Sequence, residues 1–284
     1  PPAPEARLHQ RRRLPDPIGP MPASTRNAVR VSPPGAGARS AIAASLDMPR
    51  ALTPHIQELF ADLTSLGCRP RQVVSWLRAA GIKARSTLID MGCGKGAASI
   101  LAARTLGCRV VGFDACRPFV EEARQTADRA GVGGLCEFHC ADLRRAARTV
   151  RRADAALMLN VLPMEEATSI VRRLVRPSGV FIVDDAIVLE GADAGGDRLT
   201  RAEARAFLQS RGATIEREHV MSPSEYRRLE RSLYAAFAPR ARELARRQPR
   251  LAPVIRRFLE QQRRSGAELW RGPMRGAIWM ARVR

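Results

Sequence analysis

The chain has 284 residues with 45% hydrophobic content, which is enough for a sizeable buried core and excludes a wholly disordered or fibrous protein. Its longest apolar runs have strand length, far short of the roughly 20 residues that span a bilayer, and no apolar h-region follows the basic start, so we expect a cytoplasmic protein without a membrane segment. The formal net charge is +20, and the 48 basic residues include only Lys83 and Lys95 as lysines, leaving 46 arginines. Such a bias fits GC-rich coding as well as selection for phosphate binding.

The first elements follow a long polar start. Residues 1–47 are rich in Pro, Ala, Gly and Arg and lack apolar periodicity, so we expect a disordered tail before a domain of residues 48–284. Two helices are expected within residues 48–81. Apolar residues recur at helical spacing over 53–67, and the second segment opens with Pro70 and closes with Gly81.

From residue 87 the pattern repeats strand, turn and helix. The expected strands are 87–91, 109–114, 135–140, 154–160 and 179–185, and the expected helices are 97–106, 118–130, 163–175 and 200–211. Near-continuous apolar strands joined by helices predict a parallel sheet covered on both faces. A strand at 213–220, an arginine-rich helical insertion at 221–270 and a last strand at 275–284 complete the chain.

Three glycines follow the first strand of this sheet. Gly92, Gly94 and Gly96 permit a tight turn and let backbone N–H groups approach a ligand at the start of the next helix. A parallel sheet binds ligands at the carboxyl ends of its strands, which is where this loop falls. Gly92, Gly94 and Ala97 also satisfy the dinucleotide fingerprint, so a nicotinamide dinucleotide remains open at this point.

Acidic residues at the strand ends describe the ligand further. Asp90 precedes the glycines, where a carboxylate suits an ammonium better than a pyrophosphate. Asp114 ends the second strand, where it can accept ribose hydroxyls, and Asp142 follows the third, where it can accept from an adenine amino group. Asp114 could instead be a turn residue, and Asp142 a helix N-cap. Together the three acids indicate a ligand with an ammonium, a ribose and an adenine but no phosphates.

The stretch "LIDMGCGKG", residues 88–96, resembles the first motif of the class I S-adenosylmethionine-dependent methyltransferases, and the resemblance covers about residues 70–284. It implies an α/β, Rossmann-like doubly wound sheet of seven strands in the order 3-2-1-4-5-7-6, with the last strand antiparallel. Bacterial small-molecule methyltransferases with a helical cap insertion are similar. In this family the glycine loop lies against the methionine part of S-adenosylmethionine, and the acids at Asp114 and Asp142 hold ribose and adenine. The expected cofactor-binding residues are Asp90, Gly92, Cys93, Gly94, Gly96, Asp114, Ala115, Asp142, Leu143 and Asn160.

Methyl transfer from a sulfonium is an in-line displacement in which the cofactor supplies the leaving group, so alignment matters more than a catalytic triad. Asn160 is interpreted as a cofactor or substrate contact, and no "PP-aromatic" continuation follows it as in DNA amino-methylating enzymes. Asp184 and Asp185 are expected to cap loops. A catechol-type metal site, the alternative for this pair, needs an acid where Asn160 stands, so no metal is predicted. His219 is a candidate general base.

The six cysteines form no CxxC pair, and we interpret them as buried, reduced thiols, with a metal- or arsenic-handling cluster as the alternative. Within the glycine loop, Cys93 and Lys95 are expected to be spacers, and Lys95 is expected to be solvated.

Apolar stripes in the insertion predict a cap over the mouth of the sheet, which with residues 52–66 would select the methyl acceptor. Arginines such as Arg242, Arg246 and Arg256 would favour an anionic acceptor. Without interleaved aromatic residues the insertion does not favour nucleic acid. The predicted function is therefore S-adenosylmethionine-dependent methyl transfer to a small molecule. The alternatives are an RNA or protein methyltransferase, and a NAD-type dehydrogenase or non-catalytic binder on the same sheet.

Overall fold

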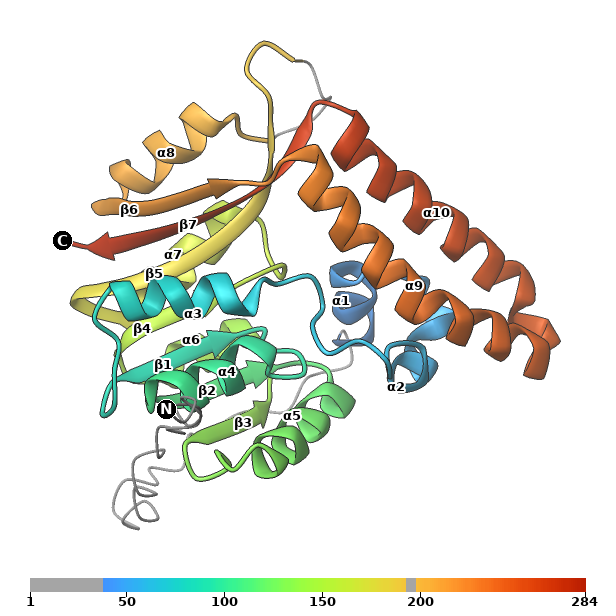
Figure 1. Cartoon of the computed structure of the whole chain (residues 1–284), viewed down its shortest axis with the longest axis horizontal. Coiled ribbons are helices and arrows are strands. Elements are labelled where there is room, and N and C mark those ends of the chain that lie inside the picture. The colour runs from blue at the N-terminus through green and yellow to red at the C-terminus, as the bar shows by residue number, and fades with distance from the viewer. Residues whose placement is uncertain (1–37, 193–197) are drawn as a thin grey trace, which may run out of the picture.

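The computed structural model describes residues 38–192 and 198–284, and this part of the chain forms one seven-stranded sheet in the order β3-β2-β1-β4-β5-β7-β6 (Figure 1). Strands β1 to β5 pair in parallel, and β7 is antiparallel to both β5 and β6. The fold class and strand order expected from the sequence are confirmed. The strands are β1 Thr87–Met91, β2 Arg109–Asp114, β3 Cys136–Cys140, β4 Ala153–Met158, β5 Val175–Val188, β6 Ala213–Val220 and β7 Met274–Val283.

Helices cover both faces of the sheet, as near-continuous apolar strands require. One face packs against α3 (Pro70–Ala79), α4 (Ala97–Leu106) and α5 (Arg117–Arg129). The other packs against α6 (Leu143–Thr149), α7 (Met164–Leu174) and α8 (Arg201–Ser210). The carboxyl ends of the parallel strands are left open to a third layer.

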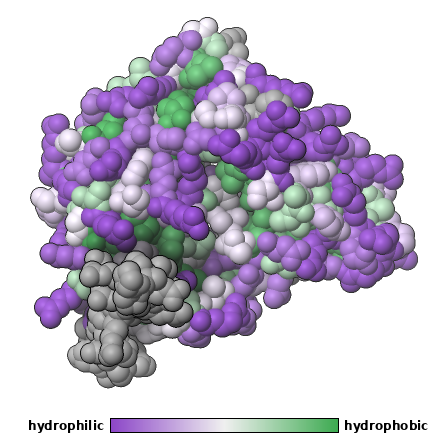
Figure 2. Space-filling model, viewed as in Figure 1, coloured by the Kyte–Doolittle hydropathy of each residue, from purple (hydrophilic) through white to green (hydrophobic). Residues whose placement is uncertain are grey.

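That third layer is the cap. It consists of α9 (Pro223–Arg247), the short 3-10 turn η3 (Pro249–Leu251) and α10 (Ala252–Arg271), which lie between β6 and β7 in the chain and project to one side of the sheet (Figure 1). A capping box between Ser222 and Glu225 starts α9. The buried side of the cap shares an apolar cluster with α1 (Ala38–Ser45), η2 (Arg50–His55) and α2 (Ile56–Leu59), while hydrophilic residues dominate its outer surface (Figure 2).

Two expectations for the N-terminal part need correction. Residues 38–45, assigned above to a disordered tail, form α1, in which Ala43 is buried and Ile42 packs against the cap cluster. The rest of that tail, residues 1–37, lies outside the described residues. The helix expected over 53–67 is only η2 and α2, and the chain from Phe60 to Arg69 is irregular. Its backbone passes through Gly67 at φ +100, which a helix cannot continue through.

Other boundaries shift by a few residues, the largest change being β5, which runs from Val175 to Val188 because it pairs with β7 over most of its length. Among the described helices none is long and apolar enough to cross a bilayer. The six cysteines are free thiols, and burial raises the pKa of Cys68 to about 11 and the pKa of Cys116 to about 12. Within residues 38–192 and 198–284, no three His, Cys, Asp or Glu side chains are grouped as metal ligands would be.

Candidate functional site

The glycine loop is hydrogen-bonded to the end of β2. The backbone N–H groups of Gly92 and Cys93 both donate to the carbonyl of Phe113, at 2.7 and 3.0 Å. A Cβ on Gly92 would stand 2.2 Å from Val161 Cγ2, so only glycine fits there. Gly96 has another role, since it does not line the cavity described below and its Cβ would meet the Phe138 ring at 3.0 Å. Gly96 thus lets α4 approach β3.

Asp114 ties this loop to the end of β2. Its Oδ2 accepts from the N–H of Gly94 and its Oδ1 from the N–H of Cys116, both at 2.8 Å. Burial raises the pKa of this carboxyl although both hydrogen bonds oppose the shift. Each carboxylate oxygen keeps a second lone pair, so ribose hydroxyls could still be accepted. The ribose role of Asp114 stays a prediction.

Asp90 is a buried acid aimed at the same cavity, with 4% of its surface exposed. Ser99 Oγ donates to its Oδ2 at 2.6 Å. Burial raises the pKa of Asp90 to about 6, which the Ser99 hydrogen bond opposes and the charge of Asp114 reinforces. A cationic ligand group would stabilise the ionised form of such a carboxyl.

The next two strand ends add polar groups. Asp142 accepts from the N–H of Arg145 at 3.0 Å and caps α6, so the N-cap alternative is realised, and the residue also lines the cavity. Its adenine contact stays a prediction. Asn160 adopts a left-handed φ of +58, and its N–H donates to Asp184 Oδ1 at 2.8 Å.

Asp184 and Asp185 organise the loop after β4, as expected. Asp185 Oδ2 accepts from the N–H of Met164 at 2.8 Å, at the start of α7, while Asp184 holds Asn160. Asp184 is half-buried and borders the cavity, and burial raises its pKa to about 7, with the charge of Asp185 adding to the shift. The loop-capping interpretation is confirmed.

Lys95 corrects an expectation from the sequence. Its side chain is 2% exposed rather than solvated, and its Nζ donates to the Phe60 carbonyl at 2.6 Å and pairs with Glu122 Oε2 at 2.9 Å. A buried ammonium needs such partners because desolvation alone would be very costly. A lysine between two glycines carried no sequence signal of this role, since both partners are distant in the chain.

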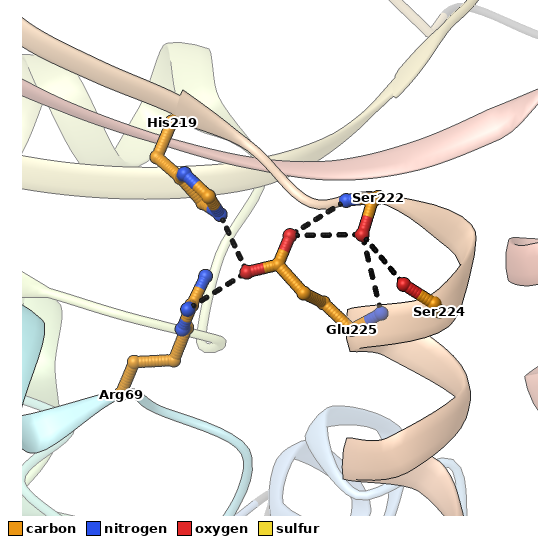
Figure 3. Close-up of polar contacts among 5 residues, drawn as sticks. All are labelled: Arg69, His219, Ser222, Ser224 and Glu225. Atoms are coloured by element: carbon orange, nitrogen blue, oxygen red, sulfur yellow. Dashed lines mark hydrogen bonds and ion pairs between the residues drawn. The ribbon is translucent and has the colours of Figure 1, made fainter.

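His219 does not border the cavity. Its Nε2 lies 3.3 Å from Glu225 Oε1, and Glu225 also accepts from Arg69 Nη2 at 3.0 Å (Figure 3). The carboxylate of Glu225 therefore joins the end of β6, the start of α3 and the first turn of α9. The hydrogen bond from the Ser222 N–H is the main cause of its low pKa of about 2, so it is charged at neutral pH. The geometry favours a structural role for His219, and its role as a base stays a prediction.

One cavity of about 1550 Å³ joins these groups to the cap. Its strand-end wall carries Asp90, Gly92, Cys93, Gly94, Asp114, Ala115, Asp142, Leu143 and Asn160, which are the predicted cofactor residues except Gly96. Its cap wall carries the apolar side chains of Ile42, Leu46, Phe60, Leu63, Leu229, Leu233 and Phe237. The sequence analysis missed the contributions of residues 67–69, Lys95 and Ile278.

The three cap arginines named in the sequence analysis lie on the polar, solvent-exposed face of the cap. Arg242, Arg246 and Arg256 are exposed and do not border the cavity, because Phe237, Ala241 and Leu244 occupy the buried side of α9. The arginines that do line the cavity are Arg69, Arg144, Arg145 and Arg198. The three cap arginines could act on an anionic acceptor only through their long-range field, and their role in selecting it stays a prediction.

Comparison with known proteins agrees with this arrangement. Residues 88–179 match a family model described as a methyltransferase domain. The fold is shared with an S-adenosylmethionine-dependent methyltransferase from Thiobacillus denitrificans solved with S-adenosyl-L-homocysteine, at a TM-score of 0.67 and 18% identity over 84% of this chain and 99% of that one. Residues 88–179 thus carry a methyltransferase domain, and the described part of the chain has the fold of S-adenosylmethionine-dependent methyltransferases. The matched residues include "LIDMGCGKG", so the methyltransferase domain predicted from that stretch is confirmed.

Curated relatives match this chain over a shorter stretch than the solved structure does. A ribosomal protein L11 methyltransferase from Tolumonas auensis is 30% identical over 112 residues, which is 39% of this chain and 37% of that protein. A carboxy-S-adenosyl-L-methionine synthase from Pasteurella multocida is 24% identical over 121 residues, 39% of this chain and 49% of that protein. The chain thus spans less than half the length of the curated relatives that it matches.

Proposed function

We propose that this methyltransferase transfers the methyl group of S-adenosylmethionine to a small molecule with a largely apolar body. The observation that carries the proposal is the cavity with two unlike walls. Its strand-end wall offers carboxylates to a ligand with an ammonium and hydroxyls, and its cap wall offers aliphatic and aromatic side chains. Pockets for one small ligand are commonly about 300–1,000 Å³, so a cavity of about 1550 Å³ has room for cofactor and acceptor together.

The residues that would hold the cofactor fit its chemistry. Asp90 and Asp114 are acids with raised pKa values that a nearby cation would ionise, and Gly92 and Gly94 keep the loop free of side chains. S-adenosylmethionine supplies the methyl group and the sulfide leaving group. The chain's own residues would align the acceptor and exclude water, as an in-line displacement requires.

Asp184 is the side chain best placed to accept a proton from a hydroxyl acceptor. It borders the cavity at the end of β5, one oxygen is used by the Asn160 N–H, and Ile278, its neighbour on β7, lines the same space. Its pKa of about 7 suits a general base at neutral pH. An amine acceptor would need this group less.

A protein acceptor is the second candidate, and the relative named as a ribosomal protein methyltransferase favours it. The apolar side chains of α1 and α9 that line the acceptor half argue for the small molecule. Two experiments test the proposal, one for the cofactor and one for the acceptor. Calorimetry with S-adenosylhomocysteine and with NADH tests the cofactor, and tritiated-methyl transfer to metabolite, RNA and protein pools tests the acceptor. Label confined to protein or RNA would overturn the small-molecule proposal.

A further inference from the structure

The buried Lys95 joins the glycine loop to a segment outside the sheet. Its Nζ has three neighbours: the Phe60 carbonyl at 2.6 Å, Glu122 Oε2 at 2.9 Å, and the Phe119 ring, whose centroid is 5.9 Å away. Glu122 and Phe119 belong to α5, whereas Phe60 follows α2. The lysine therefore fixes one point of the N-terminal segment against the loop on which the cofactor is proposed to lie.

Phe60 carries this connection on to the cap. Its ring centroid lies 6.0 Å from that of Phe237 on α9, which in turn lies 5.6 Å from Phe258 on α10. Phe60 and Phe237 both line the acceptor half of the cavity. Close-packed aromatic contacts transmit displacement because interiors have little free volume. A displacement of the Phe60 backbone would therefore also displace Phe237 on the cap wall.

Residues 60–69, here termed the strap, cover the glycine loop. A Cβ on Gly94 would stand 3.2 Å from Leu66 Cδ1, so the strap lies directly over that glycine. The strap is held at its first residue by Lys95 and at its last by the ion pair of Arg69 with Glu225, 3.0 Å long, on the first turn of α9 (Figure 3). Both anchors therefore connect the strap to elements that border the cavity.

We propose that Lys95 is a positioning residue for methyl transfer, coupling occupancy of the glycine loop to the placement of the cap wall that faces the acceptor. The inference rests on the proposed function, because it needs a ligand in the loop. A cofactor that binds better when Lys95 holds the strap also stabilises that position of the strap. The two free-energy changes are equal, because coupling between two sites is reciprocal. Lys95 borders the cavity, but its Nζ is engaged by the Phe60 carbonyl and by Glu122, so we assign it no part in the reaction beyond positioning.

The two lysines of the chain allow a direct test on the unmodified protein. Lys83 is exposed and Lys95 is buried, so acetylation by a water-soluble N-hydroxysuccinimide ester, followed by peptide mapping, measures strap opening against an internal reference. We expect Lys95 to react at least about tenfold more slowly than Lys83. S-adenosylhomocysteine should slow Lys95 further by about threefold or more and leave Lys83 unchanged. An unchanged Lys95 rate with bound ligand would overturn the proposal.

Hydrogen exchange then tests the coupling itself. In the wild type and in the matched control Lys83→Met, S-adenosylhomocysteine should protect amides of the glycine loop, the strap and residues 229–241 of α9. In Lys95→Met it should protect the glycine loop alone, and its dissociation should be at least about fivefold faster. Protection of α9 at the wild-type level in Lys95→Met would sink the inference.

Two outcomes keep the proposals distinguishable. If the wild type does not bind S-adenosylhomocysteine, the proposed function fails and the inference fails with it. If the wild type binds but Lys95→Met shows undiminished coupling, only the inference fails. Should Lys95→Met not fold, Glu122→Gln removes the charged partner at a site that is 30% exposed, and it should lower the α9 protection in the same direction. Full protection there would count against the inference.

Discussion

The two walls of the cavity are built by different kinds of contact. The strand-end wall is held by short polar links within the sheet, such as Asp114 to Gly94 and Asp184 to Asn160, both at 2.8 Å. The cap wall is held by apolar packing among α1, α2, α9 and α10, with ion pairs such as Arg240 to Asp62 at its edge. Directional links fix a geometry, whereas apolar packing tolerates changes of shape. We therefore expect cofactor recognition to be rigid and acceptor recognition to be adaptable.

The sharpest way to break this division is to place a side chain in the glycine loop. Gly94→Val should weaken S-adenosylhomocysteine binding by on the order of 100-fold or more, because valine is strained at φ +51 and its side chain would meet Leu66. Gly131→Val is a matched control, since Gly131 has φ +70, open space around it and no place in the cavity. Calorimetry should show full affinity for the control, and retained affinity in Gly94→Val would mean that the loop does not hold the cofactor.

Removing a directional link should have the next largest effect. Asp114→Ala should weaken cofactor binding by about 1 to 3 kcal/mol, because it leaves the N–H groups of Gly94 and Cys116 and the ribose hydroxyls without their acceptor. Asp128→Ala, at an exposed position of α5, is the control and should bind normally. An affinity of Asp114→Ala equal to that of the control would exclude the residue from the site.

Proton release on cofactor binding tests which carboxylate of the strand-end wall faces the ligand ammonium. The pKa of Asp90 is raised to about 6 in the free protein, and a ligand ammonium should lower it, so binding at about pH 6 should release up to roughly half a proton. Affinity should accordingly rise with pH through that region and then level off. Calorimetry in buffers of different ionisation enthalpy measures the release. Asp90→Asn should abolish it and Asp184→Asn should preserve it, and the reverse pattern would assign the ammonium to Asp184.

The smallest effect is expected on the outside of the cap. Replacing Arg242, Arg246 and Arg256 by Gln should change S-adenosylhomocysteine affinity less than about twofold, or about 0.4 kcal/mol, because all three are exposed and outside the cavity. Turnover should also be unaffected for neutral and anionic acceptors alike. Leu229→Gln, on the cap wall, should raise the acceptor KM without changing cofactor affinity. A loss of cofactor affinity in either variant would contradict the assignment of cofactor binding to the strand-end wall alone.

Much of the strand-end wall could be predicted from the sequence, whereas the contacts of Lys95 could not. Gly92, Asp90 and Asp114 belong to consecutive strand-turn-helix units, so their meeting point follows from local pattern and the rules of parallel sheets. Lys95 and the strap could not be predicted in this way, because the burial of Lys95 depends on Phe60 and on Glu122, which come together only through tertiary packing. No local sequence pattern marks Lys95 as a partner of Phe60 or of Glu122.

The cap arginines are a different case, because their signal was present in the sequence. Phe237, Ala241 and Leu244 recur at helical spacing, which turns Arg242 and Arg246 to the opposite side of α9. Helical periodicity alone therefore places both arginines on the solvent side, where the structure has them. The helix expected at 53–67 ends at Leu59, after which the Phe60 carbonyl accepts from the Leu63 N–H in a turn and from the distant Lys95, a contact that no local pattern predicts.

The cap leaves and re-enters the sheet at neighbouring points. Val220 pairs with Ala277, and the N–H of Met221 donates to the carbonyl of Gly276 at 2.8 Å, so both ends of the 50-odd residues between them meet on adjacent antiparallel strands. Insertions whose ends lie side by side are tolerated well, because a short hairpin would connect the same two points. The strands that carry the chemistry can therefore stay constant while the insertion is exchanged as a cassette, which gives this architecture a simple route by which new acceptors can be acquired in evolution or by grafting.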